Sequence, residues 1–97
     1  MSDLDKIKKT LKKNKQSLQQ DFNVKKLGIF GSYVRGEQKK NSDVDILVEF
    51  FQTPGLFDYM KVESRLSTIL HKKVDFVMKG ALKLRIGKNV MREVVYV

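Results

Sequence analysis

Hydrophobic residues recur at two different periods along the chain, and each period predicts a different kind of element. Over residues 3–20 they are spaced three and four positions apart, as on one face of a helix, and a second such pattern runs over residues 56–71. Residues 24–30, 43–51 and 74–78 are short apolar segments with the length and composition of strands. The pattern therefore predicts helix, strand, strand, helix and strand in that order.

Each of the two predicted helices has one apolar face and recognisable ends. Ser2 or Asp3 is the expected N-cap of the first helix and Thr53 that of the second, because short oxygen-bearing side chains accept hydrogen bonds from the first backbone N–H groups. His71 ends the second helix, where a capping or surface role is expected rather than catalysis. The positions expected on the two apolar faces are Leu4, Ile7, Leu11, Asn14 and Leu18 in the first helix, and Leu56, Tyr59, Met60, Glu63, Leu66, Ile69 and Leu70 in the second.

Shorter elements connect and follow these segments. Residues 32–35 predict a single helical turn that ends at Gly36, and residues 37–42 predict a polar loop. After the third strand, residues 81–90 predict a helix and residues 93–97 a short last strand.

The second predicted strand has two unlike faces, because alternate residues of a strand point to opposite sides of the sheet. Asp43 and Asp45 stand at alternate positions, so they share a face about 6.5–7 Å apart. Carboxylates held side by side repel unless a cation lies between them, and oxygen ligands of this kind suit Mg²⁺. One face is expected to be core (Val44, Ile46, Val48 and Phe50), and the other to begin as a site (Asp43, Asp45, Leu47 and Glu49).

Upstream of the aspartates, a Gly31-Ser32 turn lies between a strand and a helical turn. Exposed backbone N–H groups at such a turn can hold a phosphate, and the Ser32 hydroxyl can add a hydrogen bond. Arg35 lies one turn further on and can offer its forked donors to polyphosphate oxygens. The turn is therefore a candidate phosphate site.

Downstream, Asp75 interrupts the otherwise apolar third strand, and an unpaired buried charge is costly. If this strand lies beside the second, Asp75 can face Asp43 and Asp45. Three carboxylates suffice for two metal ions about 3.5–4 Å apart, the arrangement used for in-line displacement at phosphorus. In that scheme Asp43 and Asp45 bind both ions, and Asp75 binds the ion that activates the attacking hydroxyl or accepts its proton.

Each of these residues also has an ordinary structural interpretation. Asp43 could simply begin a strand, Asp75 could pair with Lys72 or Lys73, and Arg35 could form a surface ion pair with Glu37. The order and spacing of the residues within one strand–turn–strand unit favour the functional interpretation over these separate ones.

The composition limits the class of protein. The 97 residues, 41% hydrophobic and 32% charged, are expected to form one domain spanning residues 1–97. No apolar run approaches the roughly 20 residues that span a bilayer, and no signal peptide is visible, so the cytoplasm is the expected location. The absence of cysteine excludes thiolate metal sites. The net charge of +9 favours a polyanion or an acidic partner, or reflects only a solvated lysine surface, and direct nucleic-acid binding is not the favoured use.

The run GSYVRGEQKKNSDVDILVEF resembles the signature of the polymerase-β-like nucleotidyltransferase superfamily, and more closely that of the minimal nucleotidyltransferase (MNT) family. The resemblance extends over essentially the whole chain. Its loop carries Lys39-Lys40-Asn41 where the family more often has a small residue or proline. The positions that match the family pattern are Gly31, Ser32, Arg35, Gly36, Ser42, Asp43 and Asp45, with Asp75 matched by strand context.

The resemblance implies a mixed α/β (α+β) domain with a short twisted sheet backed by helices. It implies Mg²⁺, with ATP as the substrate, and nucleotide contacts from Gly31, Ser32, Arg35 and Ser42. Such proteins are commonly paired with a HEPN-domain toxin, an RNase, and the MNT partner is the antitoxin that transfers AMP to a toxin tyrosine. Homo-oligomers, or hetero-oligomers with the toxin, are compatible with this family.

Two other functions stay open from the sequence. The chain could be a non-catalytic nucleotide-binding antitoxin that neutralises its partner by contact alone, and neutralisation that survives loss of Asp43 and Asp45 would favour it. It could instead modify RNA or a small molecule such as an aminoglycoside. Relatives that modify RNA or small molecules carry extra domains that form the acceptor pocket, and 97 residues leave no room for such a domain.

Overall fold

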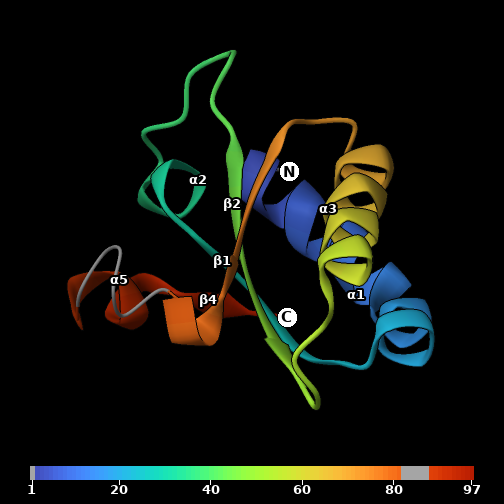
Figure 1. Ribbon diagram of the computed structural model, residues 1–97. Helices are drawn as coiled ribbons and strands as arrows, with labels where there is room; N and C mark the ends of the chain where they lie inside the picture. Colours follow the sequence, from blue (N-terminus) through green and yellow to red (C-terminus); the bar gives the residue numbers. More distant parts are fainter. Residues whose placement is uncertain (1, 82–87) are drawn as a thin grey trace.

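The computed structural model describes residues 2–81 and 88–97, and in that part four strands form one mixed sheet (Figure 1). Their order across the sheet is β3-β2-β1-β4. Strand β1 runs antiparallel to both β2 and β4, whereas β2 and β3 are parallel. The strands are β1 (Val24–Phe30), β2 (Val44–Phe50), β3 (Val74–Met78) and β4 (Val95–Tyr96). The α+β class implied by the sequence is therefore confirmed.

Helices α1 (Asp3–Phe22) and α3 (Leu56–Leu70) cover one face of this sheet, and α5 (Lys88–Glu93) lies on the other side (Figure 1). The short helix α2 (Ser32–Arg35) follows the end of β1. Because β2 and β3 are parallel, α3 has to carry the chain back from the end of one strand to the start of the next. This crossover places the first residues of β2 and β3 side by side.

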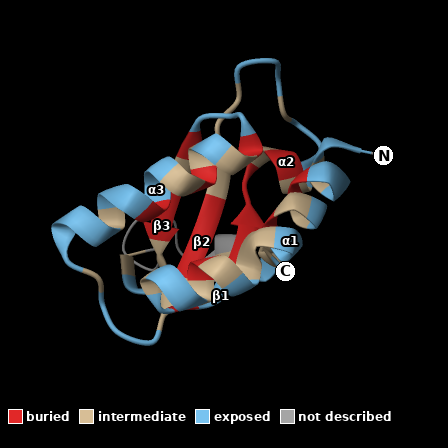
Figure 2. Cartoon of the chain, turned by 90° about the vertical axis from the view of Figure 1, so that its right-hand side faces the viewer, coloured by how far each residue is buried: buried red, intermediate tan, exposed pale blue. Residues whose placement is uncertain are grey.

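The sheet separates two apolar clusters. Figure 2 shows the buried residues of the strands behind helices α1 and α3. The larger cluster lies between the sheet and helices α1 and α3, and it includes Ile46 and Phe76. On the opposite face, Leu47 and Val77 pack with Phe30 against the C-terminal segment. The alternation predicted for the second strand is thus confirmed. The residues two positions before Leu47 and Val77 are aspartates, which share the second face.

Helix α1 begins as predicted and extends slightly further. The Ser2 hydroxyl accepts a hydrogen bond from the Asp5 N–H at 3.1 Å, so Ser2 is the N-cap. Ile7, Leu11 and Leu18 are buried, as the helical period predicts. The helix runs to Phe22 rather than to residue 20.

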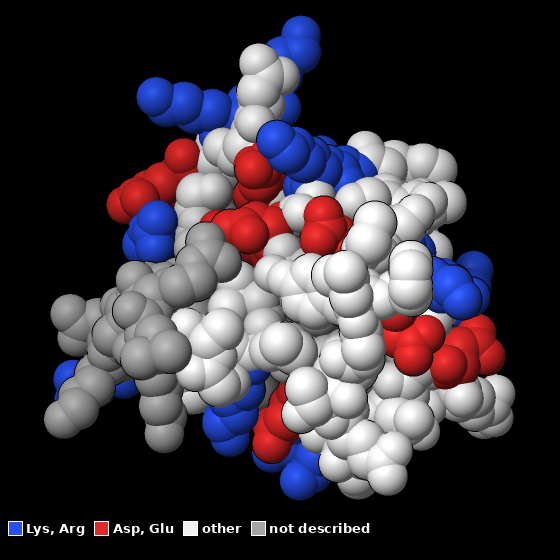
Figure 3. Space-filling view, in the orientation of Figure 1, with Lys and Arg blue, Asp and Glu red and all other residues white. Residues whose placement is uncertain are grey.

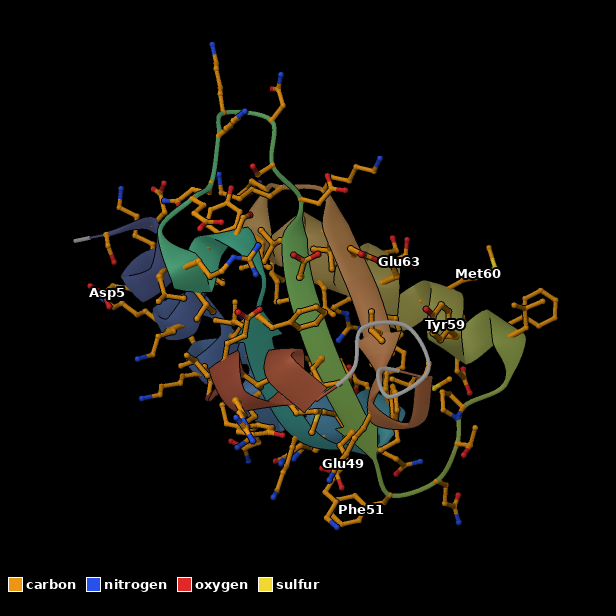
Figure 4. The ribbon with its side chains drawn as sticks, turned by 90° about the vertical axis from the view of Figure 1, so that its left-hand side faces the viewer. Asp5, Glu49, Phe51, Tyr59, Met60 and Glu63 are labelled. Carbon is orange, nitrogen blue, oxygen red and sulfur yellow. The ribbon has the colours of Figure 1, made fainter. Side chains whose placement is uncertain are left out.

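The face predicted for α3 is partly wrong. The residues it buries are Val62, Leu66 and Leu70, whereas Leu56 is 71% exposed and Met60 57% exposed. Figure 4 shows Met60 on the outer side of α3. Apolar residues occur on more than one side of this helix, so its sequence fits more than one inner face. In the structure the inner face follows Val62, Leu66 and Leu70, which are spaced four residues apart, and Met60 lies outside it.

The N-terminal end of α3 also differs from the prediction, whereas the C-terminal end agrees with it. Thr53 is not the N-cap. Gly55 occupies that position, and because glycine has no side chain, no side-chain hydrogen bond caps this end of the helix. His71 is the C-cap, with a left-handed φ of 54°, so its expected capping role is confirmed. No described helix is long and apolar enough to cross a membrane.

The C-terminal segment contains α5, which lies on the other face of the sheet, and β4, which pairs with β1. The helix predicted for residues 81–90 lies mostly outside the described residues, because residues 82–87 are not described. The last strand is β4, Val95–Tyr96, and Glu93, predicted to begin that strand, instead ends α5. A backbone hydrogen bond from Val97 N–H to the Leu27 carbonyl, 3.0 Å long, fixes this end to the sheet.

Candidate active site

Asp45 of β2 and Asp75 of β3 are direct partners in the parallel register of the two strands. Asp43 stands just before β2, on the same side as Asp45. The condition attached to the sequence prediction, that the third strand lies beside the second, is therefore met. Figure 3 shows acidic side chains gathered over this end of the sheet, below basic side chains of the protruding loop.

The Asp45 carboxyl is the electrostatic centre of this cluster. Partial burial raises its pKa from 3.8 to about 6, assisted by the negative charges of Asp75 and Asp43 and by a hydrogen bond with the Asp75 side chain. The positive charge of Arg35 acts in the opposite direction. A cluster of acids that raises one of its own pKa values is typical of sites that bind a cation.

The raised pKa predicts how the stability of the metal-free protein depends on pH. Since the folded state binds the Asp45 proton more tightly than the unfolded chain, this group stabilises the fold below pH 3.8 and the contribution is lost as the pH rises through about 6. At pH 7 in EDTA, Asp45→Asn is expected to raise the free energy of unfolding by about 1–2 kcal/mol, a value already reduced for solvent screening. Urea unfolding at pH 4 and pH 7 measures it.

The control for that measurement is Asp58→Asn, which removes one exposed acid from the first turn of α3. This variant is expected to gain no stability, because the chain has a net charge of +9 and a negative charge is favourable at a helix N-terminus. A gain at pH 7 that is equal in the two variants would show that the effect is not specific to Asp45. In that case the Asp45 carboxyl would not be strained by its neighbours.

Gly31 is fixed both by its backbone and by its neighbour. Its φ of 80° and ψ of −152° belong to a region that is open almost exclusively to glycine. A Cβ at this position would collide with the Asp45 carboxylate. The turn and the acidic cluster therefore pack directly against each other, as the phosphate and metal halves of one site would.

Helix α2 begins immediately after this glycine. The N–H groups of Val34 and Arg35 both bond to the Gly31 carbonyl, whereas those of Ser32 and Tyr33 have no acceptor among the described residues. These two N–H groups and the Ser32 hydroxyl form the donor set that the sequence predicted for a phosphate. The Gly31 N–H is not part of it, because it donates to Glu93 Oε1 at 3.0 Å.

Arg35 lies at the last position of α2 and makes two ion pairs. Its Nε donates to Glu37 at 3.0 Å, and its Nη1 donates to Glu93 Oε1 at 3.0 Å. These hydrogen bonds, that of Glu37 first, raise the pKa of the guanidinium. The pair with Glu37 suggested by the sequence is present, yet Nη2 makes no hydrogen bond to any described residue. That nitrogen is the donor left for a phosphate.

Ser42 closes the loop before the aspartates. Its hydroxyl accepts a hydrogen bond from the Lys39 N–H at 2.8 Å, and its own N–H donates to the Lys39 carbonyl at 3.1 Å. Ser42, which the sequence predicts to contact the nucleotide, thus lies next to Asp43 and also shapes the loop. A cavity of about 280 Å³ opens here, lined by Lys40, Asn41, Ser42, Asp43, His71, Lys72 and Lys73.

The acidic cluster supplies the type of ligand that a metal ion needs, but its side chains are not already arranged around a metal position. Within residues 2–81 and 88–97, no three histidine, cysteine, aspartate or glutamate side chains are arranged to hold a metal ion, and Asp45 and Asp75 are hydrogen-bonded to each other. Nevertheless, carboxylate oxygens are the ligands that Mg²⁺ prefers, and it usually keeps waters and takes phosphate oxygens as well. A substrate phosphate would complete such a site.

Sequence reasoning missed one residue of this region, Glu93. It contacts both Gly31 and Arg35 although it lies 62 and 58 residues away from them. The only signal available was an acid near the end of the chain, expected to begin a strand, and nothing in the local pattern connects it with the turn.

Comparisons with known proteins agree with this geometry. The model of the nucleotidyltransferase domain matches residues 4–97. Protein adenylyltransferase MntA of Thermococcus cleftensis is 48% identical over 97 residues, covering 100% of this chain and 98% of the relative. A Methanocaldococcus jannaschii protein provisionally named a protein adenylyltransferase is 44% identical over 98 residues, covering 100% of both.

Two solved structures are similar as well. A protein provisionally described as a minimal nucleotidyltransferase superposes with a TM-score of 0.71 and 30% identity, covering 98% of this chain and 95% of that one. A crystal structure of a toxin–antitoxin with AMP-PNP gives a TM-score of 0.57 and 28% identity, covering 81% of this chain and 61% of that one.

The fold and the cluster of acids beside a Gly-Ser turn thus define an enzyme of the nucleotidyltransferase class. The chain belongs to the nucleotidyltransferase domain family, with a match over nearly its whole length, and the resemblance to minimal nucleotidyltransferases seen in the sequence is confirmed.

Proposed function

We propose that the chain transfers AMP from ATP to a partner protein, with Mg²⁺ as cofactor, and acts as the antitoxin of a toxin–antitoxin pair. The acceptor is a tyrosine of a HEPN-type RNase toxin. The observation that carries this proposal is the meeting of Asp43, Asp45 and Asp75 beside the Gly31 turn, in a chain that matches protein adenylyltransferase MntA from end to end. The AMP-PNP of the toxin–antitoxin neighbour supports ATP as the donor.

The positions of the residues support the following proposed roles. The phosphates bind to the N–H groups of Ser32 and Tyr33, to the Ser32 hydroxyl and to Arg35. Gly31 allows the phosphates to approach the backbone closely, and Ser42, which closes the loop, contacts the nucleotide. The residues that would hold two Mg²⁺ ions are Asp43, Asp45 and Asp75. Bound Mg²⁺ supplies neutralisation of phosphate charge and a lower pKa for the attacking hydroxyl.

The reaction is an in-line displacement at the α-phosphorus of ATP. The acceptor oxygen forms a bond to that phosphorus, the bond to the bridging oxygen of the β-phosphate breaks, and pyrophosphate leaves. The hydroxyl proton passes to Asp75, which lies on the outer strand of the sheet beside Asp45. We expect the acceptor to bring its own binding surface to this domain, and the reaction to take place in the cytoplasm.

The test uses the purified chain, a co-expressed HEPN-type partner, and ATP labelled at either the α- or the γ-phosphate. We expect the partner to be labelled from α-labelled ATP alone, the label to be lost in EDTA and restored by Mg²⁺, and Tyr→Phe variants of the partner to lose it. Label from the γ-position would instead identify a kinase. Neutralisation of the toxin without any label would identify an antitoxin that acts by contact.

A further inference from the structure

The carboxylate of Glu93 connects the C-terminal segment with the two ends of α2. It accepts a hydrogen bond from the Gly31 N–H at 3.0 Å, and Arg35 Nη1 donates to its Oε1 at 3.0 Å and to its Oε2 at 3.3 Å. The Glu93 side chain is only 21% exposed, against 65% for Glu37, the other carboxylate on Arg35. A mostly buried carboxylate from a distant part of the chain therefore holds the turn through three hydrogen bonds.

Both partners of Glu93 belong to the segment that binds the nucleotide in the proposed function. A free arginine side chain samples many rotamers, and binding a phosphate then requires one of them to be selected at a cost in affinity. Glu93 holds the guanidinium through Nη1 and leaves Nη2 without a partner among the described residues. The same carboxylate also holds the Gly31 N–H, and with it the strained backbone from which α2 begins.

We propose that Glu93 is a positioning residue for ATP binding: it orients Arg35 and the Gly31 turn before the nucleotide arrives. The inference rests on the proposed function, because it assigns Arg35 to the phosphates. Glu93 acts through Arg35 and does not touch the nucleotide.

An alternative interpretation of the same contacts is that the Glu93 carboxylate occupies the phosphate-binding position and that ATP has to displace it. The donors argue against this interpretation. Glu93 uses the Gly31 N–H, but the N–H groups of Ser32 and Tyr33, which begin α2, have no acceptor in the described chain. An anion lodged in the phosphate place would take those donors first. Glu93 therefore supports the turn from its side.

The experiment measures ATP binding without any acceptor protein, by calorimetry with Mg²⁺–ATP, and then the steady-state kinetics with the acceptor. Glu93→Ala is expected to weaken ATP binding and raise the KM for ATP by about tenfold or more, as for loss of one charge-assisted contact, with kcat changed less than about threefold. Glu93→Gln, which keeps an acceptor for the Gly31 N–H, is expected to lie between Glu93→Ala and the native chain.

A double-mutant cycle identifies the route of the effect. In an Arg35→Ala background, Glu93→Ala is expected to weaken ATP binding by about threefold or less, because only its hydrogen bond with the Gly31 N–H is left to lose. Glu37→Gln is the matched control: it also removes a charge partner from Arg35, but an exposed one that does not reach Gly31. We expect that variant to bind ATP like the native chain, since exposed ion pairs contribute little.

Three results would overturn the positioning role. Tighter ATP binding by Glu93→Ala would mean that the carboxylate occupies the phosphate place. Equal losses in the native and Arg35→Ala backgrounds, or a fall in kcat with an unchanged KM, would mean that Glu93 only supports the fold. If Glu93→Ala does not fold, as judged by circular dichroism, the same cycle is run with Glu93→Gln. Failure of the native chain to bind ATP would instead contradict the proposed function itself.

Discussion

Replacing Asp43 and Asp45 together with asparagine is expected to lower AMP transfer by at least about 1,000-fold, the scale on which losing the charge-stabilising groups of a phosphoryl-transfer site acts. Asparagine keeps the size of each side chain but removes the negative charge that a pair of Mg²⁺ ions needs for neutralisation. The measurement is the initial rate of label transfer from α-labelled ATP to the partner at saturating Mg²⁺.

Glu49→Gln is the control for this double variant, because Glu49 lies on the same strand as Asp45 at its other end and pairs with Lys25 and Lys79. We expect that variant to transfer AMP at close to the native rate. The double variant should be folded and, in EDTA at pH 7, more stable than the native chain, for the reason given by the raised pKa of Asp45. A folded double variant with native activity would show that the carboxylates are not part of the site.

The sequence predicted the placement of the candidate site residues well where its information is local. Alternation along β2 alone assigned Asp45 to one face and Ile46 to the core, because a strand has a period of two whatever surrounds it. The Gly31-Ser32 turn between a strand and a helix was similarly recognisable. The need for glycine is sharper than the sequence suggested, since both a positive φ and the approach of Asp45 require it.

Prediction was weaker where tertiary contacts decide. That Asp75 meets Asp45 depends on the pairing of β3 with β2, which the sequence could state only as a condition. Glu93 was missed because its hydrogen bonds to Gly31 and Arg35 join parts of the chain that share no local pattern. In α3, apolar residues on more than one side made the period ambiguous, so Met60 was expected inside although it lies outside.

These differences have a common physical origin. A local period determines which residues share a face, whereas the packing of other elements determines what that face meets. The carboxylate half of the site is encoded within one strand, and its third member depends on the crossover through α3. In the proposed phosphate half, the Gly31 N–H also bonds to Glu93, at the end of α5. This contact can form only when the C-terminal segment has folded against the rest of the domain.

Gly31→Ala is the single substitution expected to damage both halves at once. Alanine at φ 80° and ψ −152° costs about 1–3 kcal/mol in backbone strain, and its Cβ would enter the space of the Asp45 carboxylate. Relief requires Asp45 to move or the turn to open, and either change separates the phosphates from the cation. We expect transfer to fall by at least about 100-fold, the loss that a displacement of about 1 Å can cause, together with a lower midpoint in urea.

Two other glycines separate the causes of that loss. Gly36 also has a positive φ, 70°, but open space around its Cβ position, and Gly55 has open space and an ordinary φ of −72°. Gly36→Ala should therefore lose stability from strain alone, and Gly55→Ala should change little. If Gly31→Ala lost no more activity than Gly36→Ala at equal folded fraction, the close approach of Asp45 would have no catalytic meaning. A greater loss for Gly31→Ala would show that the turn and the aspartate must stay in contact for the reaction.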